Sequence, residues 1–134
     1  MTPIQQLMLG VGVSKKTYLD DVFSTYVYEG TGSARSINNG INLSGEGGMT
    51  WIKSREETEW HHLFDTVRGA GEGIFSNSNV AEITDTTRLS SFNNNGFSLG
   101  TEYRVNKNDI DFSSWTFRKA PGFFTIKEYS GSGS

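Results

Sequence analysis

One short segment of the sequence gathers the residue types that carry out catalysis or bind metals. Trp60, His61, His62 and Asp65 lie within six residues of one another. On a strand, neighbouring side chains point to opposite faces, so His61 and His62 cannot hold one metal ion together. A zinc site would need further ligands, and the sequence contains no cysteine. We therefore interpret both histidines as structural, and we expect no metal site and no cofactor.

The same alternation places Trp60 and His62 on one face of a strand. Trp60 follows a charged turn, which makes it the best candidate for an exposed ring. Trp51 and Trp115 lie inside alternating segments, and we expect them in the core. The alternative to a purely structural role is that Trp60 with His62 contacts a glycan.

Two pairs of acidic residues could in principle supply the carboxylates that a glycoside hydrolase needs. These residues are Glu56 with Glu57 and Asp109 with Asp111. Both pairs lie in segments expected to be exposed turns, where nothing raises a pKa. Asn106 and Asn108 add oxygen atoms that suit calcium, but the spacing does not match an EF-hand loop. We interpret these side chains as solvated surface groups, and we expect no enzymatic activity.

The elements that must position these residues are short strands. Apolar and polar residues alternate over residues 22–28, 49–53 and 112–118. An Asn-Asn-Gly turn predicts a strand or hairpin over 34–43, and a Pro-Gly turn predicts a returning strand over 123–129. We find no convincing helical period after residue 20. Short strands with frequent turn signals predict an all-β fold, a single β-sandwich or jelly roll.

Composition limits the classes of partner. The net charge is −3, and its 12 basic residues form no stripe, which argues against nucleic-acid binding. The first 16 residues lack the charge order of a signal peptide and the roughly 20 apolar residues of a membrane span. Without cysteine, stability must come from packing of the nine Phe, five Tyr and three Trp residues, or from oligomerisation.

Residues 1–20 differ from the rest of the chain, which we assign to one domain over residues 21–134. The first 17 residues contain no aromatic side chain, and their apolar side chains form a short run broken by glycines. One interpretation is a loosely packed terminus. The other is a short extended attachment arm that docks in a groove of a partner or a sister subunit. Its partner-binding side chains would be Ile4, Leu7, Met8, Leu9, Val11 and Val13.

One tyrosine and Gly/Ser segment occurs twice. Tyr28-Glu-Gly-Thr-Gly-Ser33 is echoed 101 residues later by Tyr129-Ser-Gly-Ser-Gly-Ser134. The echo is a coincidence between two turns, a linker remnant, or the sign that residues 125–134 begin a further repeat in a longer chain. The offset matches the size of one sandwich domain.

Several longer strings carry a family resemblance. They are Tyr28-Glu-Gly-Thr-Gly-Ser-Ala-Arg-Ser-Ile-Asn-Asn-Gly40, Leu43-Ser-Gly-Glu-Gly-Gly-Met-Thr-Trp-Ile-Lys-Ser-Arg55, Leu63-Phe-Asp-Thr-Val-Arg-Gly69, Asn94-Asn-Gly-Phe-Ser-Leu-Gly100 and Trp115-Thr-Phe-Arg-Lys-Ala-Pro-Gly-Phe-Phe124. In combination they resemble a module of tail-fibre and other virion structural proteins of marine phages, notably those that infect cyanobacteria. None of these strings is a catalytic motif.

The resemblance implies a concanavalin-like β-sandwich in a longer fibre chain. It implies a virion protein, made in the host cytoplasm, that forms the N-terminal part of a tail fibre. Residues 1–20 would attach the fibre to other tail or baseplate proteins, and distal repeats would recognise the host. Phage fibres are usually trimers, which suggests a homotrimer. The resemblance supplies no site residues. The alternatives are a carbohydrate-binding module that contacts host surface glycans, and a hydrolase that acts on capsule or lipopolysaccharide.

Overall fold

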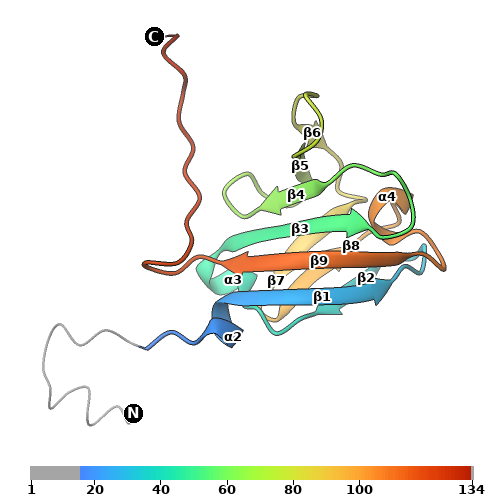
Figure 1. Cartoon of the computed structure of the whole chain (residues 1–134), viewed down its shortest axis with the longest axis horizontal. Coiled ribbons are helices and arrows are strands. Elements are labelled where there is room, and N and C mark those ends of the chain that lie inside the picture. The colour runs from blue at the N-terminus through green and yellow to red at the C-terminus, as the bar shows by residue number, and fades with distance from the viewer. Residues whose placement is uncertain (1–15, 134) are drawn as a thin grey trace, which may run out of the picture.

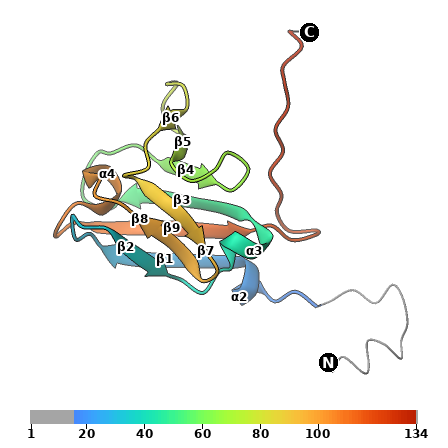
Figure 2. The same cartoon turned by 180° about the vertical axis from the view of Figure 1, so that it is seen from behind.

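Two antiparallel sheets pack face to face in the computed structural model, which describes residues 16–133 (Figure 1). The larger sheet contains, in spatial order, β1 (Phe23–Glu29), β9 (Asp111–Arg118), β3 (Gly48–Ser54), β4 (His62–Asp65), β5 (Glu72–Phe75) and β6 (Ile83–Thr84). The smaller sheet contains β2 (Arg35–Asn38), β8 (Gly96–Leu99) and β7 (Leu89–Asn93). Figure 1 looks onto the outer face of the larger sheet, and Figure 2 looks onto the smaller one. The predicted all-β sandwich is confirmed.

The core lies between the two sheets. In β3, burial alternates strictly, so that Thr50 and Ile52 point inward while Trp51 points outward. The same period of two runs along β9, as expected for strands packed on one face. The largest fully buried side chains include Phe64, Phe97, Phe112, Ile37, Ile41, Leu43, Ile52, Leu89, Leu99 and Val105.

The first and last strands of the larger sheet are neighbours. β1 pairs with β9 over all seven residues of β1, from Phe23 opposite Phe117 to Glu29 opposite Asp111. The chain therefore enters β1 and leaves β9 at the same end of the sandwich, as both views show (Figures 1 and 2). The loops at the opposite end include the segment between β1 and β2 and the segment that follows α4 (Tyr103–Asn106).

Within residues 16–133, three helices of four residues each accompany the strands: α2 (Leu19–Val22) precedes β1, α3 (Leu43–Glu46) lies between β2 and β3, and α4 lies between β8 and β9. Asn106, the last residue of α4, is fully buried. Its carboxamide oxygen accepts from the Thr31 amide at 3.0 Å, and its nitrogen donates to the carbonyl oxygens of Ser33 at 2.7 Å and Gly100 at 2.9 Å. This side chain therefore joins three loops at one end of the sandwich.

Of the two alternatives predicted for residues 34–43, the strand is present as β2 and the hairpin is wrong. β2 pairs with β8, and the chain then crosses towards α3 and the larger sheet. Asn39 directs this crossing, because its Nδ2 donates to Thr116 Oγ1 in β9 at 2.9 Å and its Oδ1 accepts from the Ile41 amide at 3.1 Å. Gly40 adopts the expected positive φ, 84°. The turn is thus present, but it connects two sheets.

The predicted returning strand over residues 123–129 is also wrong. A single bridge joins Ala120 to Phe124, and no strand follows it as far as residue 133. Both edges of β9 are already occupied, by β1 and by β3, so a returning strand cannot pair with β9. Tyr129 is 91% exposed, whereas Tyr28, its counterpart in the sequence echo, is 5% exposed at the end of β1. The two copies therefore differ in structure.

The apolar residues assigned to the attachment arm, from Ile4 to Val13, lie outside the described residues. Within residues 16–133, no helix is long and apolar enough to cross a membrane.

Candidate binding face

Two tryptophans face solvent at the centre of the larger sheet. Trp51 of β3 and Trp115 of β9 are directly opposite in register, with ring centroids 5.5 Å apart and ring planes at 59°. Both are half-buried on the outer face, because the residues next to each of them, such as Ile52 and Thr116, point into the core. The expectation that Trp51 and Trp115 are core residues is therefore wrong.

The register extends these rings into a continuous line across five strands, which we call the aromatic row. It consists of Thr25, Trp115, Trp51, Leu63 and Ile74, each opposite the next. Trp115, Trp51, Leu63 and Ile74 are half-buried, and Thr25 is exposed. A solvated sheet face is usually polar, so the apolar line across its centre makes this face the candidate contact surface.

A hydrogen bond fixes the indole of Trp51. Its Nε1 donates to His61 Nδ1 at 2.9 Å, and the two rings meet edge to face with centroids 5.5 Å apart. Because Nδ1 accepts this bond, the proton of a neutral His61 is on Nε2. The His61 backbone amide is bound in turn by Asn77 Oδ1 at 3.0 Å. The indole is thus held in place by contacts within the fold.

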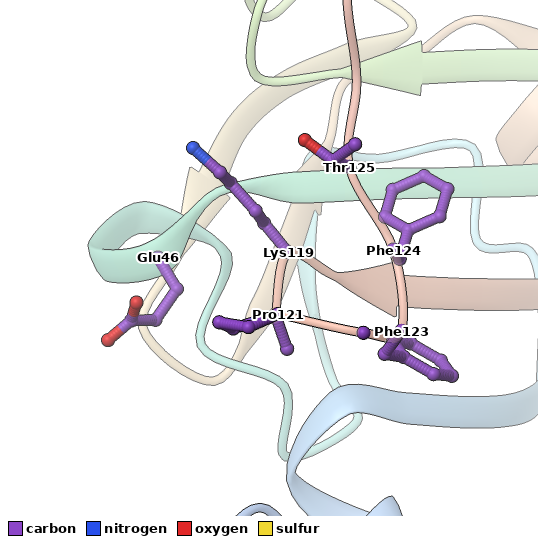
Figure 3. A pocket seen from close by; sticks show the side chains of 8 residues that line it. Glu46, Lys119, Pro121, Phe123, Phe124 and Thr125 are labelled. Carbon is purple, nitrogen blue, oxygen red and sulfur yellow. The ribbon is translucent and has the colours of Figure 1, made fainter. Parts of the chain in front are cut away.

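A phenylalanine cluster lies beside the row, at the end where the chain leaves β9. Phe117 contacts Phe23 at 5.0 Å, Phe124 at 5.4 Å and Phe123 at 6.5 Å between ring centroids. The turn that carries Phe123 and Phe124 lines an open pocket of about 520 Å³. Figure 3 shows these two rings on one side of the pocket, with Glu46 and Lys119 reaching out on the other.

Residues 19–132 match the family described as "Domain of unknown function (DUF7483)". The chain belongs to this family. The matched range includes both sheets and every residue of the aromatic row. Neither a curated protein nor a solved structure matches the chain.

Within the DUF7483 domain, the predicted glycan contact of Trp60 with His62 needs correction. The Trp60 ring is half-buried and packs edge to face on Phe75, with centroids 4.9 Å apart. His62 is 0% exposed, and its Nδ1 is 2.9 Å from the Trp60 carbonyl oxygen. Burial lowers the pKa of His62 to about 4, so the ring is neutral at pH 7. His62 therefore offers no surface to a sugar, and its role is structural, as the interpretation of the histidines proposed.

Asp65, the remaining member of the His-Asp segment, is buried and closes a turn. Its Oδ1 accepts from the backbone amides of Val67 at 3.0 Å and Arg68 at 2.8 Å, and its Oδ2 pairs with the Arg68 guanidinium. Side-chain bonding to Asp65 raises the pKa of Arg68. Asp65 is therefore fully engaged in holding the β4–β5 connection and does not act on His61.

The acidic pairs lie at the end of the sandwich that is remote from the phenylalanine cluster. Glu56 accepts from the Asp111 amide at 2.7 Å, Asp111 pairs with Arg55 at 3.4 Å, and Glu57 pairs with Lys107. The bond to Glu57 raises the pKa of Lys107. Among residues 16–133, no three His, Asp or Glu side chains are grouped so that they could hold a metal ion. Three of these four carboxylates are thus tied to neighbours across the loops.

Proposed function

We propose that this chain is a non-catalytic binding and structural module of a phage tail fibre, and that its contact surface is the outer face of the larger sheet. The aromatic row is the observation that carries the proposal. The inner face of this sheet is already packed against the smaller sheet, so Trp51 and Trp115 are not needed to close the core. Large rings that stay on the solvent side of a sheet are typical of binding surfaces.

The position of the flanking segments supports a setting in a longer chain. The chain enters at Phe23 and leaves after Arg118, beside Phe117, which is the cross-strand partner of Phe23. Domains whose ends lie close together can be inserted into a chain without changing its path. The module would then stand to one side of the fibre, with the aromatic row on its flank. The fibre setting itself comes from the sequence strings, and with it the homotrimer and the attachment of residues 1–20 to tail or baseplate proteins.

The engagement of the acidic residues favours binding over hydrolysis. A glycosidase of the common type needs two carboxyl groups that flank one bond, with one of them free to give a proton. Here Glu57 is held by Lys107, Asp111 by Arg55, and Asp65 by Arg68. These ion pairs connect loops and serve the stability of the fold.

Immunogold electron microscopy tests the fibre assignment directly. Antibodies raised against this chain are applied to purified particles of the phage that encodes it. We expect gold on the tail fibres, and labelling that is competed away by the free chain. Gold confined to the capsid would contradict the proposal. So would the absence of gold on intact particles when the antibody does bind the proteins released from disrupted particles.

A further inference from the structure

We propose that the aromatic row binds a neutral glycan, with Trp115 and Trp51 stacking on a sugar ring and the polar groups beside them binding its hydroxyls. The inference rests on the contact face of the proposed function, and it names the ligand class of that face. It replaces the predicted pair Trp60 and His62 as the glycan contact.

The apolar half of the site is preorganised. A pyranose has C–H faces that pack on aromatic rings, and rigid rings lose little conformational freedom on binding. Trp51 is fixed by its 2.9 Å hydrogen bond to His61. Trp115 is confined between Trp51 on β3 and Thr25 on β1. The 59° angle between the two indole planes gives a shallow corner, which suits one sugar ring better than a flat extended partner.

Polar groups with spare hydrogen-bonding capacity flank the indoles. His61 Nδ1 accepts from Trp51, which places the proton of the neutral ring on Nε2. This Nε2–H group makes no hydrogen bond to another residue among residues 16–133. The hydroxyls of Thr25 and Ser113 likewise make no hydrogen bond within this part of the chain. Thr25 is the cross-strand partner of Trp115. Ser113 precedes Trp115 by two residues and lies on the same face of β9. A few polar groups around an apolar centre are what a sugar site requires.

The charges on this face favour a neutral ligand. The cation nearest in register is Lys53, which is opposite Ser113. Its ammonium group already donates to the carbonyl oxygens of Ser54 at 2.7 Å and Glu57 at 2.8 Å. The aromatic row itself contains no charged residue. These two bonds hold the ammonium group at the turn after Ser54, so a uronic acid or a sulfated sugar stacked on the indoles would find no cation within the aromatic row to pair with its charge.

Isothermal titration calorimetry, guided by an array screen, tests the site. The 134-residue chain is screened against neutral hexose and N-acetylhexosamine oligosaccharides, with uronic-acid and sulfated oligosaccharides as the second arm. We expect binding in the neutral arm, and we expect Trp115→Ala to weaken it at least about tenfold, which corresponds to about 1.4 kcal/mol. Trp60→Ala is the matched control, because Trp60 packs on Phe75 away from the row, and its affinity should stay within about twofold.

Thr25→Val provides a variant that keeps the shape of the side chain and removes only the hydroxyl. Thr25 is exposed on an edge strand, so this variant folds, and we expect it to weaken neutral-glycan binding by severalfold. No binding at millimolar neutral glycan, binding only of anionic sugars, or an equal loss in Trp60→Ala would overturn the inference.

The outcome separates this inference from the fibre proposal. If gold labels the tail fibres and Trp115→Ala weakens a contact with a viral protein, while no neutral glycan binds, the module is a fibre component and the glycan inference is wrong. If neutral glycans bind through Trp115 and no gold appears on fibres, the glycan inference holds and the fibre setting is wrong.

Discussion

His62 is a titratable residue whose ring is fully buried in the core. Its ring stacks on Phe64 with centroids 6.1 Å apart and meets Phe75 edge to face at 5.0 Å. Burial removes the solvation that a charged imidazole needs, and this is the main reason that its pKa falls to about 4. The fold therefore holds His62 neutral over a pH range in which the unfolded chain is protonated.

This difference predicts acid sensitivity. Between pH 6.5 and pH 4 the unfolded state binds one more proton at His62 than the folded state, so the free energy of unfolding falls as the pH falls. The slope is about 1.4 kcal/mol per pH unit, and the total loss is about 3 kcal/mol. Urea unfolding at pH 7, 6, 5 and 4 measures it. His62→Leu should flatten this part of the curve, whereas substitution of His61, the only other histidine, should leave it in place.

Asn106 is a second residue whose effect is expected to be large. Asn106→Ala removes the partner of the Thr31 amide and of the Gly100 carbonyl oxygen, and it removes one of the two donors to the Ser33 carbonyl oxygen. We expect a loss of about 2–4 kcal/mol in the free energy of unfolding. Asn108→Ala is the control, because the exposed Asn108 side chain bonds only to the neighbouring Asp109. Equal denaturation midpoints for the two variants would contradict this role of Asn106.

The candidate site could be predicted only in part at this scale. The alternation that places Trp51 and Trp115 on one face is legible in the sequence, but which face is packed is not. Aromatic residues usually indicate the inner face, but here threonine and serine share that face of β3 and β9 with Ile52 and Phe112. Thr50 and Thr116 tolerate burial because their hydroxyls bond to each other at 2.8 Å. This cross-strand partner belongs to a strand 66 residues away, and the local pattern does not reveal it.

At the scale of elements, the contact between the β7–β8 turn and β2 depends on a glycine. Gly96 has a φ of 148°, and a Cβ atom there would lie 1.9 Å from the Ile37 carbonyl oxygen of β2. Gly96→Ala should therefore separate β2 from β8 and lower the free energy of unfolding by more than about 2 kcal/mol. Gly131→Ala, where a Cβ meets nothing within 4 Å, should leave it unchanged. Thermal unfolding followed by circular dichroism measures both variants.

Element prediction succeeded where the signal is local. β3 and β9 show the alternating burial expected of half-buried strands, and β1 forms where the sequence alternates over residues 22–28. Element prediction failed where the structure of a segment depends on which strand is available to pair with it. Residues 123–129 have the composition of a strand, but β9 has no free edge to offer them. Residues 34–43 contain a turn signal, but Asn39 uses it to cross between sheets.

At the scale of the whole molecule, the sandwich should not depend on the segment before it. The hydrogen-bonded pairs of both sheets lie within residues 23–118. Deleting residues 1–15 should therefore leave the unfolding midpoint unchanged, because α2 and β1 remain intact. If these residues form the attachment arm, the truncated chain should fail to enter virions in a complementation assay. Normal incorporation of the truncated chain would show that the fibre is attached in another way.

The adjacency of β1 and β9 also determines how the module unfolds under mechanical tension. A tension applied through the two flanking segments acts on the Phe23–Phe117 end of the pair, so it opens the ladder one rung at a time instead of shearing all rungs together. Such an unzipping path yields at low force. If the module belongs to a tail fibre, as we propose, tension between virus and cell would have to pass through contacts between neighbouring subunits and bypass this sandwich.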